Sequence, residues 1–440
     1  MISKIWRTGR VFLEAMAERR VPYRSAARLR ETQNRRVRET ISYAYETVPY
    51  YRETLREKHL RPEDFQTADD LARLPLIDRN FVKENQTVFR SSQFPYEICA
   101  KLESGGGTTT CWDPAASVKR LSLAERDRVI WLKLTKGRKR QLYLFPDTGA
   151  TMAARKFYDS QVVTPHFVAE RFFLDPIEPF DAVAERIEQL RPDIVYSYGS
   201  YLEEFSRYLR NQRHSGGMPK LWVYGADTVT DSWRDIVQRE MGCRVVANYT
   251  STECGRIGFE CEQQQGYHLN IDFCPVRTIR DDGSGCADGE IGHVVVSNLL
   301  NRATVLLNYL QGDLAEFTSQ MCPCGRTLPR LIRLHGRVSS VVEMADGQRL
   351  PSTVLIGHLA NQLQIVLQYQ IQSISPGRIL FRVSLPEGTD QIAFEQALLS
   401  RFNSVYGDRA KAQVQFVSNI PRQPSGKFEI VAGPEASVSE

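Results

Sequence analysis

A glycine-rich segment near residue 105 is the first feature of the chain that could bind a phosphate. It reads SGGGTTT from Ser104 to Thr110. Glycines let backbone N–H groups approach an anion closely, and hydroxyl groups can bond its oxygens. The same composition is typical of an ordinary flexible loop, so this segment alone does not decide the function. The candidate phosphate-binding residues are Ser104, Gly105, Gly106, Gly107 and Thr108.

Three later motifs add acids and a cation. YTSTE ends at Glu253 after a strand-like run, Gly312 precedes Asp313, and a Ser-Gly-Lys sequence ends at Lys427. Activation of a carboxylate by ATP needs a phosphate loop, an adenine contact, a carboxylate for Mg²⁺, an acid for the ribose and a cation at the α-phosphate. The chain offers each of these. Two alternatives stay open, namely a helix N-cap at Ser251 or Thr252 and a plain turn at Gly312.

The order of these motifs resembles that of the adenylate-forming enzyme superfamily. The YTSTE segment is similar to the superfamily's tyrosine-x-x-threonine-glutamate motif. The resemblance implies that Tyr249 lies on the adenine face, Thr252 binds a phosphate oxygen and Glu253 binds Mg²⁺. A magnesium ion held by one carboxylate and substrate phosphates is usual for that metal.

Three further positions extend the resemblance towards the C-terminus. YLQGD, which ends at Asp313, is similar to the tyrosine-x-threonine-glycine-aspartate motif, whose acid accepts hydrogen bonds from both ribose hydroxyls. Gly336-Arg337 resembles the start of the hinge motif and implies Arg337 near the ribose and phosphate. PSGK, ending at Lys427, resembles the loop whose lysine reaches the substrate carboxylate and the α-phosphate.

The N-terminal part narrows the resemblance to phenylacetate-coenzyme A ligases and their relatives in polysaccharide and coenzyme biosynthesis. Four motifs carry it, namely YYR at Tyr50, PED at Pro62, DDL at Asp69 and LPLI at Leu74. The resemblance then covers nearly the whole chain. It implies an acyl-pocket role for Tyr198, Gly199 and Ser200, and an adenine-lining role for Gly225, Ala226 and Asp227.

The chain also departs from the family pattern. The family's phosphate loop usually continues to a glycine and a proline, whereas Thr109-Thr110-Cys111 stands here. The hinge commonly carries acids, but Ser339 and Ser340 occupy that place. These differences leave open a specialised or even a non-catalytic member of the family.

Four residues indicate a structural zinc site. Cys322-Pro-Cys324 offers two thiolates on one tight corner, and Cys261 and His268 offer two more ligands on a second short segment. Thiolates with one imidazole suit tetrahedral zinc, and four protein ligands would leave no open position for water. Similar placements accompany zinc in some relatives, and Cys254 is a substitute ligand. The alternative is separate core thiols with a surface histidine.

Size and composition limit the class of protein. A chain of 440 residues with 42% hydrophobic and 25% charged residues predicts an ordinary globular protein of two domains. The net charge of +5 is mild, which argues against a nucleic-acid partner. We expect no membrane span, no signal peptide and a cytoplasmic location. Nine cysteines then predict reduced thiols or metal ligands rather than disulfides.

The pattern of apolar residues predicts the elements that position these motifs. Helical spacing marks residues 28–71, with Val37, Ile41 and Ala44 on one face. From Leu142 onward, the apolar runs 142–145, 193–196, 221–224 and 244–247 alternate with amphipathic helices at 179–190 and 231–241, which favours an α/β layer of largely parallel strands. A strand-like run at 291–297 suggests a small β-rich subdomain, and a helix is expected over 390–402. We therefore expect an α/β fold with mixed sheets in a large domain, residues 1–335, and a small mobile α+β domain, residues 336–440.

The sequence thus predicts an ATP-dependent acid ligase that forms an acyl adenylate and passes the acyl group on. An aromatic or otherwise compact acid is expected as the substrate. Coenzyme A, a carrier thiol and an amine all stay open as acceptors, as does a homodimer. One alternative is an adenylyltransferase that stops at the AMP derivative. Another is a non-catalytic member in cell-surface polymer biosynthesis.

Overall fold

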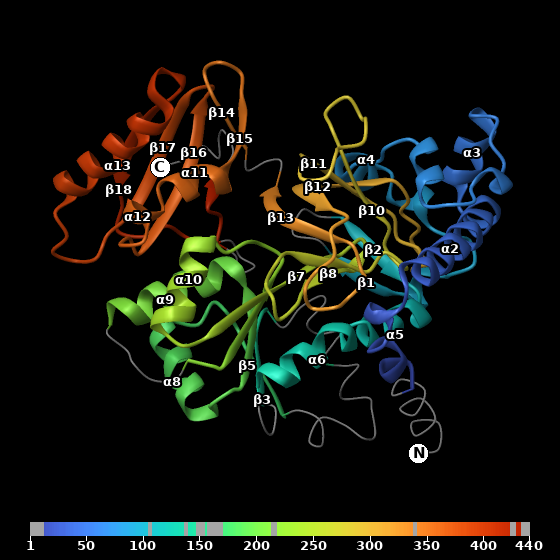
Figure 1. Cartoon of the computed structure of the whole chain (residues 1–440), viewed down its shortest axis with the longest axis horizontal. Coiled ribbons are helices and arrows are strands. Elements are labelled where there is room, and N and C mark those ends of the chain that lie inside the picture. Colours follow the sequence, from blue (N-terminus) through green and yellow to red (C-terminus); the bar gives the residue numbers. More distant parts are fainter. Residues whose placement is uncertain are drawn as a thin grey trace. The chain divides into compact units, whose positions relative to one another are not determined.

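The computed structural model describes residues 13–103, 108–135, 140–146, 155, 170–212, 218–337, 341–422 and 428–432 (Figure 1). The chain forms two units. Unit 1 comprises Met1–Lys139, Asp147–Glu170 and Val246–Leu334, and unit 2 comprises Arg140–Pro146, Arg171–Val245 and His335–Glu440. The expected domain boundary at Gly336 and the mobility of the last part stay predictions.

Unit 1 begins with helices. Ser25 accepts a hydrogen bond from the Arg28 amide and begins helix α2, and Pro49 begins α3. The face predicted from helical spacing is confirmed, since Val37, Ile41 and Ala44 are buried. The α-helices of this unit whose two ends the structure describes are α2 (Ala26–Thr47), α3 (Pro49–Glu57), α4 (Arg79–Glu84), α5 (Pro114–Ser122) and α6 (Glu125–Leu134). Short 3₁₀ turns stand at Val21–Tyr23, Pro62–Asp64, Asp69–Arg73, Gln86–Phe89 and Tyr96–Ile98.

The strands of unit 1 are mostly antiparallel. A hairpin pairs β1 (Ala100–Glu103) with β2 (Thr109–Trp112). The larger sheet runs in the order β10-β11-β12-β13-β9-β8-β7. Its strands are β7 (Arg244–Ser251), β8 (Gly255–Glu260), β9 (Tyr267–Leu269), β10 (Val276–Ile279), β11 (Ile291–Val296), β12 (Tyr309–Thr318) and β13 (Arg330–Arg337). The prediction of largely parallel strands concerns residues 142–247. Beyond them the strands pair antiparallel, because short turns such as that between β7 and β8 can join only antiparallel neighbours.

Unit 2 contains the parallel strands that the alternating pattern predicted. Strand β5 (Ile194–Tyr198) lies between β3 (Arg140–Leu144) and β6 (Leu221–Gly225), parallel to both, and β4 (Glu170–Leu174) follows β3. Helix α9 (Gly199–Asn211) packs on β5 and β6 beside α10 (Asp231–Glu240), and α8 (Phe180–Leu190) precedes β5 (Figure 1). Parallel strands place their carboxyl ends at one edge, where ligands usually bind in open α/β sheets.

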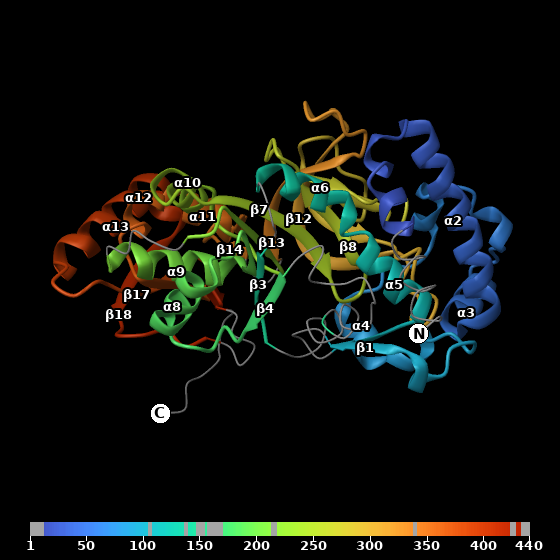
Figure 2. The same cartoon turned by 90° about the horizontal axis from the view of Figure 1, so that it is seen from below.

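The C-terminal part of unit 2 is an α+β layer with its own sheet, in the order β18-β17-β16-β19. Helix α13 lies beside this sheet (Figure 2) and extends beyond the predicted end at Phe402 to Tyr406, before Gly407. Its core includes Leu355, Ile371, Phe381, Leu398 and Phe402. The elements are β14 (Val341–Glu343), β15 (Arg349–Pro351), α11 (Ser352–His358), α12 (Ala360–Leu363), β16 (Gln368–Ser375), β17 (Arg378–Ser384), α13 (Gln391–Tyr406), a 3₁₀ turn (Gly407–Arg409), β18 (Lys411–Phe416) and β19 (Val431–Ala432).

The fold class is confirmed as a mixed α/β fold, with parallel pairs in unit 2 and antiparallel pairs in unit 1. Among the described residues, every helix is too short or too polar to cross a membrane. All nine cysteines lie in the described ranges, and each is a free thiol.

Candidate active site

Tyr249 and Asp313 lie in direct contact although they belong to motifs 64 positions apart in the chain. Tyr249 is near the end of β7, Asp313 is in β12, and each residue is 5% exposed. The Tyr249 hydroxyl donates a hydrogen bond of 2.6 Å to Asp313 Oδ2. A hydrogen bond to a carboxylate is among the stronger kinds and orients the acid. The structure therefore brings together the residues predicted for the adenine and the ribose.

Thr252 and Glu253 lie in the tight turn between the antiparallel strands β7 and β8. The Ser251 hydroxyl accepts a hydrogen bond of 3.0 Å from the Cys254 amide and stabilises this turn. A helix N-cap at Ser251 or Thr252 is therefore wrong, because the chain reverses into β8 instead of entering a helix. The Glu253 residue is buried.

The backbone of this turn is held on two sides. Trp112 Nε1 donates to the Thr252 carbonyl at 3.1 Å, and Asn298 Nδ2 donates to the Glu253 carbonyl at 2.8 Å. Gly255, which begins β8, has φ +70°, and a Cβ there would lie 3.1 Å from the Trp112 ring. The position of Glu253 is thus set by residues distant in sequence.

The chain before and after the glycine-rich segment forms two paired strands. Ser104, Gly105, Gly106 and Gly107 are outside the described residues, but Glu103 of β1 pairs with Thr109 of β2 directly beside them. Thr108 is buried, and Cys111 is buried in a small core with Cys99 and Ala303. Residues 109–111, where the sequence departs from the family pattern, therefore belong to strand β2. The same strand ends at Trp112, which bonds the Glu253 turn.

The two predicted motifs in unit 2 also contact each other. Asp227 accepts hydrogen bonds through Oδ1 from the Gly199 amide and through Oδ2 from the Ser200 hydroxyl, the latter at 2.5 Å. A Cβ at Gly199 would lie 2.9 Å from the Thr228 carbonyl carbon and from the Tyr224 ring. Ala226 has a positive φ of +68°, which turns the chain sharply after β6. These contacts hold the carboxyl ends of β5 and β6 together, as parallel strands allow.

Tyr198 and Gly225 complete this edge of unit 2. Burial, and then the charges of Asp227 and Asp175, raise the pKa of Tyr198 to about 12. Its hydroxyl is therefore neutral at physiological pH and can donate a hydrogen bond. A cavity of about 460 Å³ also lies in unit 2, but its described lining includes none of the predicted site residues.

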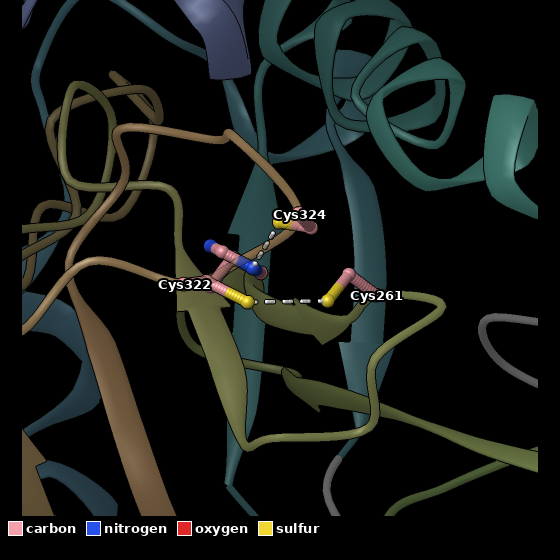
Figure 3. A group of neighbouring side chains, drawn as sticks. Cys261, Cys322 and Cys324 are labelled. Atoms are coloured by element: carbon pink, nitrogen blue, oxygen red, sulfur yellow. Dashed lines mark hydrogen bonds between the residues drawn. The ribbon is translucent and has the colours of Figure 1, made fainter.

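The four predicted zinc ligands form one cluster. The sulfur atoms of Cys261 and Cys322 lie 3.7 Å apart, and Cys324 Sγ lies 3.3 Å from His268 Nε2. Figure 3 shows the sulfur atoms of the three cysteines turned towards a common centre. All four ligand atoms lie within 4.8 Å of one another. Sulfurs at about 2.3 Å from a tetrahedral ion lie about 3.8 Å apart, so the donor set fits zinc.

The surroundings of the cluster support the same fit. His268 Nδ1 lies 3.4 Å from the Leu328 carbonyl oxygen, a partner that keeps Nε2 facing the sulfurs. At Cys324, hydrogen bonds from His268 and Arg326 outweigh burial and lower the pKa to about 6, which favours the thiolate that zinc needs. Burial instead raises the pKa of Cys261 to about 12, so this thiolate needs the positive charge of the ion beside it. Cys254, the substitute ligand, is not in this cluster, and a hydrogen bond with the free thiol of Cys274 raises its pKa.

Comparison with known proteins identifies relatives along most of the chain. No family model matches it. The phenylacetate-coenzyme A ligase of Thermus thermophilus is 26% identical over 358 residues, which cover 78% of each chain. The enzyme of the same name from Escherichia coli K12 is 25% identical over 423 residues, which cover 90% of this chain and 93% of the relative.

A solved structure of 2-hydroxyisobutyryl-CoA ligase, in the postadenylation state and in complex with an acyl-AMP, has the same fold. Its TM-score is 0.79 at 18% identity, with 94% of this chain and 91% of that chain covered. The same ligase in its thioesterification state has a TM-score of 0.60. Over most of its length the chain is therefore similar to phenylacetate-coenzyme A ligases, and it shares the fold of a ligase solved with an acyl-AMP.

Lys427 and Arg337, two further residues predicted for the site of this ligase-like protein, take no part in the contacts described above. Lys427 is outside the described residues. Arg337 is exposed at the end of β13, directly after Gly336, whose φ is +88°. The roles of both stay predictions, as do the individual roles of Tyr249, Thr252, Glu253 and Asp313.

Sequence reasoning missed two residues that hold the Glu253 turn in this ligase-like protein, Trp112 and Asn298. Asn298 follows β11, and its Oδ1 accepts from the amides of Leu300 and Asn301, which is typical of an asparagine that forms a turn. That local signal could predict the turn. It could not predict Glu253 as a partner, because the contact is made only in the tertiary structure.

Proposed function

We propose that this protein activates a carboxylic acid with ATP as an acyl adenylate and then transfers the acyl group to the thiol of coenzyme A. The observation that supports this best is the contact between Tyr249 and Asp313, beside the Glu253 turn on the same sheet. The motif of Tyr249 and the motif of Asp313 are distant in sequence, and a nucleotide-binding site requires them to lie together as they do here. The names of the relatives, which are coenzyme A ligases, support the acceptor.

The first step joins the acid to AMP. A carboxylate oxygen of the substrate attacks the α-phosphorus of ATP, and pyrophosphate leaves. Asp313, oriented by Tyr249, would bind the ribose, and Glu253 would offer its carboxylate to Mg²⁺, which prefers oxygen ligands and retains waters. Lys427 would stabilise the charge that develops between the carboxylate and the phosphate.

The second step releases AMP. The acceptor sulfur attacks the acyl carbon, the bond to the phosphate oxygen breaks, and the thiol proton is lost to solvent or a base. The related ligase is known in separate postadenylation and thioesterification states. We therefore propose that the small C-terminal domain changes its position between the two steps. ATP and coenzyme A are both cytoplasmic metabolites, which supports the expected location.

The proposed function is tested by a screen of carboxylic acids in ATP–pyrophosphate exchange, followed by thioester formation with coenzyme A. Aromatic and other compact acids should give exchange. Exchange without transfer to coenzyme A, a carrier thiol or an amine would favour the alternative adenylyltransferase. No exchange with any acid, together with no ATP binding, would refute the enzyme and favour the non-catalytic alternative.

The role of Glu253 leads to a prediction about magnesium. Glu253→Ala should mainly slow adenylation, because the metal loses its protein carboxylate, and added Mg²⁺ should restore part of the rate. Exchange rates measured over a range of Mg²⁺ concentrations will show this. A rate that does not respond to Mg²⁺ would count against the assignment.

Asp313→Ala should instead weaken ATP binding, because its contacts to the ribose are lost. Loss of a hydrogen-bonded charged partner typically costs about 1–3 kcal/mol, which is roughly a 5-fold to 150-fold rise in the KM for ATP. Tyr249→Phe should cause a smaller rise in the same direction, since only the orientation of Asp313 is lost. Rescue of Asp313→Ala by Mg²⁺, to the same extent as Glu253→Ala, would contradict the two separate roles.

We also propose that Cys261, His268, Cys322 and Cys324 hold a structural zinc ion. The ion would join the turn after β8 to the loop between β12 and β13, and it would take no part in the reaction because four protein ligands close its coordination shell. The distances between the donor atoms support this proposal. Its test is given in the Discussion.

A further inference from the structure

The chain on either side of Lys427 is bound to one face of helix α9. Upstream, Arg422 Nε donates to Glu204 Oε2 at 2.9 Å. Downstream, the Phe428 amide donates to the Ser200 hydroxyl at 3.3 Å. Ser200 and Glu204 are one helical turn apart and therefore lie on the same face of α9. Residues 423–427 are outside the described ranges, but both of their chain neighbours are held.

The upstream contact is closely specified. The Arg422 side chain is 19% exposed and that of Glu204 is 8% exposed. Arg422 Nη1 also donates to the Pro176 carbonyl at 2.9 Å, and the guanidinium lies 4.3 Å from the Phe180 ring centroid and 5.0 Å from that of Tyr201. The planar guanidinium of Arg422 bonds two oxygens and stacks on two rings at once, and only one orientation satisfies all of these contacts. A lysine ammonium cannot reproduce them.

The neighbouring residues fix the same stretch of chain. Gln368, which begins β16, donates to Glu204 Oε1 and accepts from the Ile420 amide at 2.8 Å. On the next face of α9, the buried ion pair of Glu203 and Arg207 reaches the carbonyls of Leu363 and Val366. Buried ion pairs add little net stability, but they tolerate few alternative geometries.

The downstream contact leads directly to the predicted site. The Ser200 hydroxyl that accepts from Phe428 also donates to Asp227, which in turn holds the Gly199 amide. Phe428 is buried, and it follows Lys427 in the chain. The amide after the lysine is therefore tied to the carboxyl ends of β5 and β6, where the predicted adenine and acyl residues lie.

We propose that Glu204 and Ser200 on α9, with Arg422 and Phe428, form a brace that positions the Lys427 segment for adenylation. Arg422 and Glu204 are positioning residues in this proposal, since they act through the lysine and not on the substrate. The proposal rests on the proposed function of Lys427. Breaking the brace should slow formation of the acyl adenylate, whereas transfer from a ready-made adenylate does not need the lysine and should continue.

Three variants are decisive. Arg422→Lys keeps the positive charge at position 422. Arg422→Gln and Glu204→Gln each remove one charge of the ion pair. Displacement of a reacting group by about 1 Å can cost roughly 10²-fold in rate. We expect the kcat of pyrophosphate exchange to fall about tenfold to a hundredfold, with the KM for ATP nearly unchanged. Transfer from supplied acyl adenylate should keep its wild-type rate. Arg239→Lys, the same change at an exposed arginine of α10, should alter neither step.

Hydrogen–deuterium exchange gives a second measurement that needs no activity. Peptides covering residues 420–430 should take up deuterium faster in Arg422→Gln than in the wild type, while peptides from β17 should not change. Equal loss in both half-reactions would overturn the brace, because it indicates general destabilisation. Unchanged uptake at residues 420–430 would also overturn it. A wild-type protein inactive with every acid would instead refute the proposed function, and deuterium uptake would still decide the brace.

Discussion

Lys427→Ala should lower the rate of ATP–pyrophosphate exchange by roughly 10² to 10³-fold, the usual cost of removing one preorganised group that stabilises developing charge. The lysine is proposed to contact the substrate carboxylate and the α-phosphate in the adenylation step only. Transfer of the acyl group from supplied acyl adenylate should therefore fall far less. Single-turnover assays of the two half-reactions will measure the difference.

The matched control is Lys411→Ala, which removes an exposed lysine at the start of β18 in the same unit. That variant should retain both half-reactions. Lys427→Ala should also differ from the brace variants, because it leaves Arg422 and Phe428 in place and deuterium uptake at residues 428–432 should stay at the wild-type level. If Lys427→Ala impaired both half-reactions alike, the proposed division of roles would be wrong.

Removal of the zinc site should have the second large effect. Elemental analysis of protein purified without added metal should find close to one zinc per chain. Cys322→Ser should lose the ion, because serine is a poor ligand for zinc and only three ligands remain. Metal binding contributes to folding free energy, so a loss of several kcal/mol is expected, and Tm should fall by about 10 °C.

Chelation provides the same test without a mutation. A strong chelator should lower the Tm of the wild type to that of Cys322→Ser and should leave that variant unchanged. The control is Cys286→Ser, which changes a partly exposed cysteine outside the cluster and should keep both the zinc and the Tm. A wild-type protein that contains no metal and is fully folded would end the zinc proposal.

Local sequence patterns predicted the elements around the site well. The strands near Leu142, Val195, Val223 and Val246 and the helices after Pro179 and Thr230 occur where the apolar spacing indicated. Whether a strand or helix buries one face depends on the spacing of apolar residues within that element. The periodicity of apolar residues in the sequence therefore indicates the element directly. For the strands after residue 247 the patterns did not give the direction of pairing, because that direction depends on how the strands are connected in space.

The residue types also indicated the chemistry before any contact was known. Two thiols on one corner and a distant cysteine and histidine predicted a metal cluster, and the structure brings their four donor atoms within 4.8 Å. Asp313 and Tyr249 were predicted to serve one nucleotide, and they share a hydrogen bond. Few residue types can bind a given metal or phosphate, so their combination in a sequence is informative.

The sequence by itself therefore determined which side chains are available for adenylate chemistry and on which elements most of them lie. The tertiary structure alone decided which of them meet. Trp112 and Asn298 hold the Glu253 turn, Asp227 joins the ends of β5 and β6, and Glu204 holds Arg422 across 218 positions of sequence. The physical reason is that these contacts depend on strand order and packing, which arise only when distant segments are buried together and leave no periodic signal in the chain.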